Sequence, residues 1–285
     1  MFKNLRQKLP EIIIIGLILI AAGISTYFFV SNLETTDYVV QTNAFFAPFE
    51  FYDNREIVGV DVEIINRVAA KLGKTIAIKD VEFDVIIDNV ASGQLADAGA
   101  AGLTITDSRA AKVNFSTPYY TSVQYIIFDR SVAPPNNGSY ILWDALKNTT
   151  LGSQTGGTGY LFAETEIDEG VLKNTSTEIK GFDTHQLAAD AISAHIIDYA
   201  IADRLPAEYI IAKNPNLAAL PLYYRGANGA SDYPAEESYA IAVNKNHAEL
   251  LEAFNSVLTE MLVKDDTGNS EIDRLVLKYM GLDNE

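Results

Sequence analysis

Apolar residues recur along the chain with two different periods. In segment 60–72 they recur every three or four residues, as in a helix with one buried face, and Gly73 ends the pattern. Strands are predicted at 38–42, 49–52, 75–78, 98–105, 150–153, 196–202 and 239–243, and helices at 60–72, 83–92, 160–169, 185–194, 247–262 and 270–280. This alternation predicts an α/β fold with mostly parallel sheets.

The pattern is interrupted once, between residues 130 and 139. Pro134-Pro135-Asn136-Asn137-Gly138 predicts a loop there, and a second α/β unit follows it. The chain has 285 residues, of which 48% are hydrophobic and 21% charged. A globular chain of this size can form two lobes with separate cores.

A longer apolar run, Ile12 to Val30, lies near the N-terminus behind Lys3, Arg6 and Lys8. Signal-peptide cores span roughly 7–15 residues and membrane helices roughly 17–25. The length favours an uncleaved anchor over a cleaved signal, for which Ala21-Ala22-Gly23 is the candidate cleavage site. The basic residues on the N-terminal side predict that the chain after residue 31 lies outside the cytoplasm.

Composition excludes several classes of function. A formal net charge of -17 repels nucleic acid and anionic membrane surfaces, so neither is expected as a partner. The chain has no cysteine, which excludes disulfides, thiolate zinc sites, cysteine nucleophiles and lipid anchors on cysteine. The three histidines, His185, His195 and His247, show no metal-ligand spacing, and no metal or cofactor is expected.

Arg109 is the first candidate for holding a small ligand. It follows Ala101-Gly102-Leu103-Thr104-Ile105-Thr106, in which Gly102 allows a close approach to the backbone and Thr104 supplies a hydroxyl donor. A guanidinium can give two parallel hydrogen bonds to a carboxylate. Taken alone, however, an arginine after a threonine-rich loop is more often an exposed surface residue.

Two further segments carry candidate chemistry. The glycine-rich turn at 154–159 offers backbone N–H groups to an anion. It lacks the Gly-Lys-Ser/Thr ending of a nucleotide P-loop. A tight connection without a binding role is equally consistent with this sequence. Asp203 follows the strand 196–202, whose carboxyl end is expected to face a cleft. A carboxylate there can neutralise an ammonium group, but capping a helix that starts near Pro206 is equally consistent.

Together these segments resemble the family 3 solute-binding proteins, the polar-amino-acid receptors of ABC importers, from about Tyr38 to Gly281. The matching segments are Asn-Ala-Phe-Phe-Ala-Pro-Phe-Glu-Phe at 43–51, Gly-Val-Asp-Val-Glu at 59–63, the stretch 101–109 followed by 115–120, then 154–158, 198–203 and 268–281. The stretch 101–109 with 115–120 is the most specific. One departure is Tyr279-Met280, where the family commonly has a Trp-Phe pair.

The resemblance implies a two-lobed periplasmic-binding-protein type II fold with a two-crossover hinge. Residues 38–120 and 232–281 would form lobe 1, residues 124–226 lobe 2, and residues 1–31 the N-terminal hydrophobic helix or signal. The implied activity is binding of a free amino acid by closure of the cleft. The implied partner is the permease of an ABC importer, and a monomer is expected.

Carried over position by position, the resemblance assigns the ligand α-carboxylate to Arg109, with Thr104 and the backbone near Thr158. The α-ammonium is assigned to Asp203, with the carbonyl of Gly102. The other residues expected to contact the ligand are Asn43, Phe46, Phe83, Ala101 and Gln154.

Asn43 stands where many relatives have an acidic residue, and Ala101 and Ala202 are apolar at pocket-lining positions. A neutral polar ligand such as glutamine is therefore expected before a cationic one, since the amide of Asn43 both donates and accepts hydrogen bonds. Two alternatives share the fold: a membrane-tethered amino-acid sensor and an enzyme like the cyclohexadienyl dehydratases. The enzyme would need an acid near the ligand side chain, which Asn43 does not provide, so no catalytic activity is expected.

Overall fold

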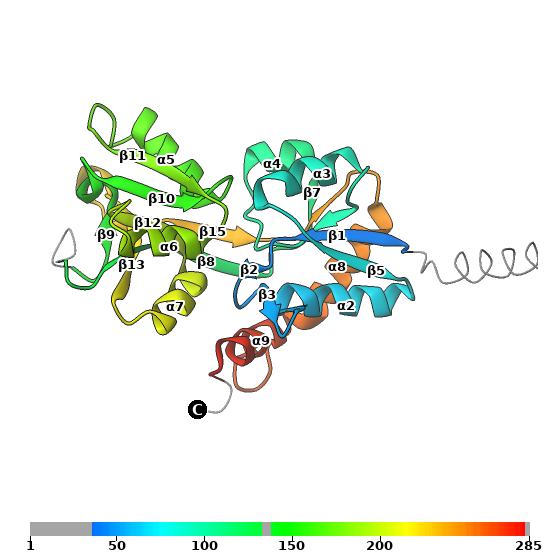
Figure 1. Ribbon diagram of the computed structural model, residues 1–285. Helices are drawn as coiled ribbons and strands as arrows, with labels where there is room; N and C mark the ends of the chain where they lie inside the picture. The colour runs from blue at the N-terminus through cyan, green and yellow to red at the C-terminus, as the bar shows by residue number, and fades with distance from the viewer. Residues whose placement is uncertain (1–35, 133–137, 283–285) are drawn as a thin grey trace, which may run out of the picture. The chain divides into compact units, whose positions relative to one another are not determined.

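A computed structural model describes residues 36–132 and 138–282 (Figure 1). The apolar run 12–30 and most of the predicted loop 134–138 lie outside these ranges. Within them, the helices are too short or too polar to cross a membrane. Residues from Tyr38 onward form one compact unit.

The first sheet contains the N-terminal strands and is completed by a strand from near the C-terminus. Its strands are β1 (Tyr38–Thr42), β5 (Ile76–Asp80), β6 (Ala98–Gly99), β7 (Asn114–Phe115) and β16 (Ala242–Val243). Their order is β5-β1-β6-β16-β7, in which β1 runs parallel to β5 and β6, and β16 runs antiparallel to β6 and β7. Its helices are α2 (Val60–Leu72), α3 (Ile86–Ser92), α4 (Asp107–Lys112), α8 (Ala248–Met261) and α9 (Glu271–Met280).

The second sheet is built from the middle of the chain. Its main strands are β8 (Tyr120–Asp129), β10 (Thr150–Gln154), β11 (Glu178–Phe182), β12 (Tyr199–Asp203), β13 (Leu217–Tyr224) and β14 (Tyr233–Pro234). The order β11-β10-β12-β8-β13-β14 is parallel from β11 to β12 and antiparallel beyond it. Its helices are α5 (Thr158–Asp168), α6 (His185–Ser193) and α7 (Arg204–Lys213). Both sheets are therefore mixed, with only their first strands parallel.

Two antiparallel strands connect the halves. Strand β8 pairs with β15 (Glu236–Tyr239) from Tyr120 opposite Tyr239 to Val123 opposite Glu236, and both run between the two sheets in Figure 1. The two connections agree with the expected two-crossover hinge. The expected lobe boundaries, 38–120 with 232–281 and 124–226, stay a prediction.

The remaining elements are short. They are β2 (Phe45–Phe46), β3 (Glu50–Asp53) and β4 (Glu56–Val58), which form a small sheet of their own, together with η1 (Phe83–Val85), β9 (Ile141–Leu142), η2 (Trp143–Leu146) and η3 (Ala227–Gly229). The small sheet places Phe46 and Phe49 in the core of the first half, beside Tyr239.

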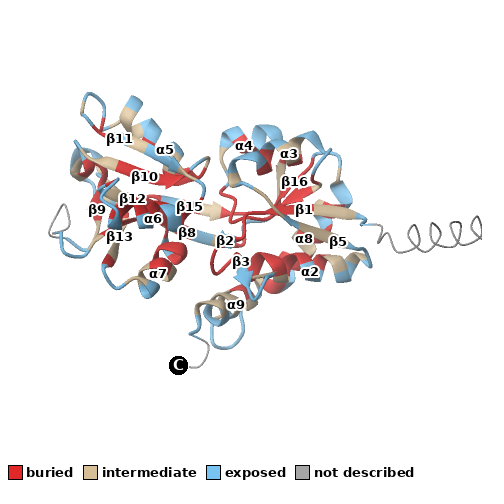
Figure 2. Cartoon of the chain, viewed as in Figure 1, coloured by how far each residue is buried: buried red, intermediate tan, exposed pale blue. Residues whose placement is uncertain are grey.

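Each half has its own hydrophobic core, as the central strands in Figure 2 show. The first core packs the helices α2 and α8 against the first sheet and contains the fully buried Phe49 and Phe254. The second half has one core on each side of its sheet, and Trp143 and Ile127 belong to different ones. The first half also has a second core, around Ile86 and Leu103, so each half contains two clusters of buried apolar residues, in agreement with the expectation of two lobes.

The predicted helix 60–72 has the predicted bounds, and Gly73 ends it in the left-handed conformation with φ 62°. The predicted helix 83–92 instead begins with the 3₁₀ turn η1. A 3₁₀ turn has three residues per turn, and Val85 at the end of this turn is 40% exposed. On α6, Leu187 is also exposed, because the buried face is formed by its neighbours Ala188, Ala191 and Ile192.

Two predicted strands are shorter than expected because the chain changes direction inside them. The segment 98–105 is paired as a strand only at Ala98–Gly99, and Gly102 then takes φ 54°. Thr104 returns to form a bridge with Tyr239. The apolar segment 239–243 is divided between the connecting strand β15 and the sheet strand β16.

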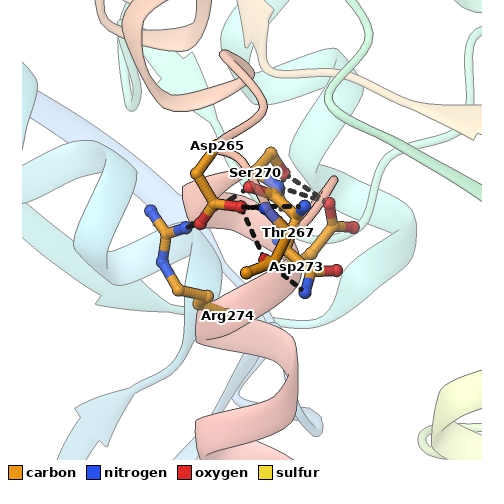
Figure 3. Close-up of polar contacts among 6 residues, drawn as sticks. Asp265, Thr267, Ser270, Asp273 and Arg274 are labelled. Carbon is orange, nitrogen blue, oxygen red and sulfur yellow. Dashed lines mark hydrogen bonds and ion pairs between the residues drawn. The ribbon is translucent and has the colours of Figure 1, made fainter.

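The C-terminal helix α9 begins at a capping box, shown in Figure 3. The hydroxyl of Ser270 accepts a bond from the Asp273 N–H, while the Asp273 carboxylate accepts one from the Ser270 N–H at 2.8 Å. The carboxylate of Asp265 accepts the N–H of Thr267 and pairs with Arg274. Reciprocal capping satisfies N–H groups that have no partner inside the helix. The helix is held to α2 by other contacts, Glu271 with Arg67 and Tyr279 with Glu63.

Candidate functional site

A cavity of about 10 Å³, room for about one water molecule, lies between the two halves. It is lined by Phe46, Phe83, Ala101, Gly102, Thr104, Gln154, Gly157, Thr158, Gly159, His185 and Asp203. All of the residues expected to bind the ligand line it except Asn43 and Arg109. The first half contributes the loop after β6 and two phenylalanines, and the second half contributes the starts of α5, α6 and α7.

A larger hollow of about 250 Å³ lies beside the small sheet. Its walls are apolar, aromatic or uncharged residues: Ala44, Phe45, Ala47, Phe51, Tyr52, Gln186, Pro206, Tyr209 and Ile210. A free amino acid carries two opposite charges, which need charged partners once they leave water. The smaller cavity, which has charged side chains around it, therefore matches the charges of such a ligand better, and it has to widen to admit one.

Arg109 lies on the short helix α4, where a loop was expected. Thr106 caps this helix by accepting the N–H of Arg109 at 3.2 Å. The guanidinium donates from Nη1 to the Thr104 carbonyl at 2.8 Å and from Nη2 to the Gly156 carbonyl at 2.9 Å. These bonds join the backbones of the two halves and use two of the five N–H donors. With 6% of Arg109 exposed, the surface alternative is wrong.

Burial lowers the pKa of Arg109, and the charges of Glu237 and Asp203 act in the opposite direction. An arginine keeps its charge under such conditions because its ordinary pKa is so high. The cavity therefore has a permanent positive charge at its edge.

Asp203 occupies the N-cap position of α7, but its side chain makes no capping hydrogen bond. It points the other way: Oδ2 accepts the hydroxyl of Tyr239 at 2.5 Å, and Oδ1 accepts the side-chain amide of Gln124. The capping alternative is therefore wrong. Burial, followed by the neighbouring charge of Glu237, raises the pKa of Asp203 well above its usual range.

Glu237 on strand β15 is a site residue that the sequence did not indicate. Its Oε2 accepts the hydroxyls of Thr104 at 2.6 Å and Thr158 at 2.5 Å, and its Oε1 accepts the amide of Gln124 at 2.5 Å. One local signal could have found it. Residues two apart share a face of a strand, so a strand beginning at 236 places Glu237 on the same side as the buried Tyr239.

The glycine-rich turn joins β10 to α5. Gln154 ends the strand, Gly157 is the N-cap residue, and Thr158 begins the helix. The N-terminus of a helix attracts anions through its free N–H groups and its dipole. The turn therefore adds positive potential on the second-half side of the cavity, opposite the loop that contains Thr104.

The loop at Gly102 is shaped by its neighbours. A Cβ added at Gly102 would lie 2.3 Å from the Phe46 ring. The group that approaches the backbone closely at this glycine is therefore the Phe46 ring. The N–H of Gly102 donates to Asp61 at 3.2 Å, and Asp61 also accepts the Tyr119 hydroxyl at 2.6 Å. Burial raises the pKa of Asp61 to about 6, and these hydrogen bonds act against that rise.

Aromatic rings line the rest of the cavity. The rings of Phe46 and His185 lie 5.5 Å apart, and the guanidinium carbon of Arg109 lies 5.5 Å from the centre of the Phe83 ring. Burial lowers the pKa of His185 to about 4, so this ring is neutral at neutral pH. Across the described ranges, acidic and histidine side chains form no group suited to a metal ion.

Asn43 is buried beside this region without lining the cavity. Its amide donates to the Val81 carbonyl at 2.8 Å, and its oxygen accepts Nε2 of Gln154 at 2.9 Å. Both groups of the Asn43 amide thus have protein partners. Direct contact of Asn43 with a ligand stays a prediction, and Gln154 is the amide that reaches the cavity.

Comparison with known proteins identifies the chain. Residues 38–281 match the bacterial extracellular solute-binding proteins, family 3. The chain belongs to this family. The match includes both sheets, both connecting strands and every residue around the cavity, and it confirms the resemblance found in the sequence.

Relatives extend over nearly the same length. The arginine-binding extracellular protein ArtP of Bacillus subtilis (strain 168) is 29% identical over 245 residues, 85% of each chain. A structure of the amino acid ABC transporter substrate-binding protein AbpA from Streptococcus pneumoniae, bound to L-arginine, has a TM-score of 0.71 at 26% identity and covers 87% of this chain and 96% of that one.

An ancestral arginine-binding protein has been solved with two ligands. The structure with arginine has a TM-score of 0.69, and the match covers 85% of this chain and 97% of the ancestral one. The structure with glutamine has a TM-score of 0.67, and the match covers 86% of this chain and 97% of the ancestral one. Both are 29% identical to this chain. Because these matches include both halves, they confirm the two-lobed periplasmic-binding-protein fold.

Proposed function

We propose that this protein binds a free α-amino acid outside the cytoplasm, prefers a cationic one, and delivers it to an ABC importer. One observation carries the proposal: Asp203 from the second half lines the cavity, and the buried guanidinium of Arg109 from the first half lies beside it, bonded to the carbonyl of the lining residue Thr104. An α-amino acid has a carboxylate and an ammonium one carbon apart. A carboxylate in the wall of a small cavity and a guanidinium beside that cavity match this pair of charges.

The preference for a cationic ligand reverses the order expected from the sequence. That order placed glutamine first because Asn43 replaces an acidic residue, but the Asn43 amide is bonded to Val81 and Gln154. Glu237 adds a carboxylate that the sequence did not indicate. ArtP and AbpA, both named for arginine, further support a cationic ligand. Glutamine remains second, since the ancestral protein was solved with both.

The mechanism we propose is stabilisation of the closed arrangement by the ligand. Contacts across the halves include Arg109 with the Gly156 carbonyl and Gln154 with Asn43. A ligand held by Arg109 on one side and Asp203 on the other adds its own contacts to both halves. The ligand therefore binds the closed arrangement more tightly than the open one, and this difference in affinity favours closure.

We also propose binding without turnover. A dehydratase would need an acid that reaches a leaving hydroxyl on the ligand side chain. The two cavity carboxylates, Asp203 and Glu237, both accept the amide of Gln124 and lie with Thr104 and Thr158 at the end assigned to the α-carbon. Measurable conversion of arogenate by the purified protein would replace this proposal.

The place of action follows in part from the family, whose members are extracellular solute-binding proteins. We propose that the apolar run 12–30 tethers the chain to the cytoplasmic membrane. Fractionation of cells should place the full-length chain with membranes and a chain lacking residues 1–31 in the soluble extract. The same location would suit a sensor, and uptake of labelled ligand in cells lacking the protein separates the two roles.

Calorimetry with the full-length chain in detergent tests the central proposal. Arginine, lysine or histidine should bind most tightly, and glutamine more weakly. Tightest binding of glutamine would overturn the cationic preference while leaving the receptor function in place. Failure of every standard amino acid to bind would overturn the function itself.

A further inference from the structure

Glu237 holds the hydroxyl groups that the ligand carboxylate is expected to use. One oxygen of its carboxylate accepts both Thr104 and Thr158, at 2.6 and 2.5 Å. These two threonines come from different halves, and their hydroxyl oxygens are 3.4 Å apart. A hydroxyl has a single hydrogen to donate, so each threonine can serve either Glu237 or a ligand carboxylate through that hydrogen.

The second oxygen of Glu237 lies at the ammonium side of the site. It shares the amide of Gln124 with Asp203, so one fully buried amide connects the two carboxylates. Glu237 itself is 5% exposed. Unlike the peripheral acids of the chain, it is therefore shielded from solvent, and its charge acts strongly on anything bound in the cavity.

The charges around the cavity do not balance. Arg109 supplies one positive group, whereas Asp203 and Glu237 supply two carboxylates. A ligand that brings only a carboxylate adds another negative charge beside Glu237, and buried like charges repel strongly. A ligand that also brings an ammonium group compensates for it.

We propose that Glu237 sets the specificity of the pocket at the α-carbon end. Its carboxylate competes with a ligand carboxylate for the Thr104 and Thr158 hydroxyls and attracts the ligand ammonium. The pocket therefore discriminates against ligands whose carboxylate is not accompanied by a nearby positive charge. This inference rests on the proposed function and names a selecting residue on the connecting strand, away from the aromatic residues that face the ligand side chain.

The test uses three probes with the full-length chain in detergent. They are the amino acid that binds most tightly in the calorimetric screen, its decarboxylated amine and its des-amino acid. For arginine these are agmatine and 5-guanidinopentanoate. In Glu237→Gln the affinity for the amine should fall about tenfold and the affinity for the des-amino acid should rise about tenfold, the size expected for losing one charged hydrogen-bonding partner.

Opposite shifts are the distinguishing result, because a loosened fold would weaken both probes together. Glu236→Gln is the matched control: the same substitution one residue away, on an exposed side chain of the same strand. It should leave both affinities unchanged. If thermal unfolding shows that Glu237→Gln is misfolded, Glu237→Ala should give the same pair of opposite shifts.

Two outcomes would overturn the inference. Shifts of both probes in the same direction, or no shift, in a folded Glu237 variant would show that Glu237 is only structural while the receptor function stands. Absence of binding by every amino acid in the wild-type screen would remove the proposed function and this inference with it.

Discussion

The two ends of the cavity are built from different kinds of side chain. At one end, Arg109, Asp203 and Glu237 are charged, buried and hydrogen-bonded to protein groups. At the other end, Phe46, Phe83 and His185 present rings, and the amide there belongs to Gln154. The first end suits the groups that all α-amino acids share, and the second suits one side chain over another. Recognition of the class and choice within it thus use different side chains, although the two sets meet where the guanidinium carbon of Arg109 lies 5.5 Å from the centre of the Phe83 ring.

The two ends also differ in what a substitution costs. Removing one member of a buried set of charged groups leaves the remaining charges unpaired. An unpaired charge has a high free energy in surroundings of low polarity. Removing a ring loses contact area and a moderate attraction for cations. We therefore expect larger losses of affinity from the charged end.

The largest effect is expected for Arg109→Ala. A buried carboxylate ligand would lose its guanidinium partner, and affinity should fall about 100-fold or more, as for truncation of a buried charge pair. Arg109→Lys should recover part of the loss, since it restores the charge without the two-pronged geometry. Calorimetry measures both, and near-normal affinity in the alanine variant would mean that the charged end does not hold the carboxylate.

The next effect is expected for Asp203→Asn, with a loss of about 30-fold for the loss of a charged hydrogen-bonding partner of the ligand ammonium. The wild type should also depend on pH. Burial and the nearby Glu237 raise the pKa of Asp203, so lowering the pH protonates this carboxyl group earlier than an ordinary aspartate. Ammonium binding needs the ionised form, and affinity should therefore decrease as the pH falls through the raised pKa.

Titrations of wild type and Asp203→Asn at neutral and mildly acidic pH provide the comparison. The variant should show a weaker pH dependence because residue 203 no longer ionises. An identical dependence in both proteins would assign it to a group other than Asp203.

A smaller effect is expected for Phe83→Ala, about tenfold for a cationic ligand, because a partly desolvated cation over a ring gains roughly 1–2 kcal/mol. The loss for glutamine should be smaller, since its side chain has no charge. Calorimetry with arginine and glutamine gives the ratio. Equal losses for both would show that the ring supplies contact area and does not select for charge.

The smallest effect is expected for Asn43→Ala, within about threefold on affinity, since truncating a residue outside the cavity removes no direct contact with the ligand. The free energy of unfolding should fall by about 1–2 kcal/mol, because the buried Val81 carbonyl and Gln154 amide lose a partner. Chemical denaturation measures the stability. A loss of affinity as large as that of Asp203→Asn would show that Asn43 contacts the ligand directly.

Part of the fold could be predicted because several elements have regular local patterns, but the two longest strands, β8 and β13, were not predicted. The helix 60–72 and the strand 38–42 have the predicted bounds, since a buried helix face and a terminal glycine are local signals. The helix α4 was missed: it has six residues and begins at a threonine cap. The break within 239–243 was hidden because Tyr239, Ala242 and Val243 are all buried, on either side of a change from connecting strand to sheet.

Less of the site could be predicted, and the reason is distance along the chain. Arg109, Thr104 and Asp203 belong to recognisable segments. Glu237 reaches Thr104 across 133 residues, and it lies in a stretch that was predicted to be neither strand nor site. Asn43 was expected to contact the ligand, and its hydrogen bond with Gln154 was not predicted. The reason is the same, because 111 residues separate the two. Pairings over such separations are decided by the tertiary fold.

A crystal structure with bound L-arginine tests the central claim most directly. The ligand carboxylate should lie within hydrogen-bonding distance of the Arg109 guanidinium and its ammonium within that distance of Asp203, with the side chain between Phe46 and Phe83. A ligand bound in the reverse orientation, or in the apolar hollow beside Tyr52 and Tyr209, would contradict the assignment of the charged end to the α-carbon.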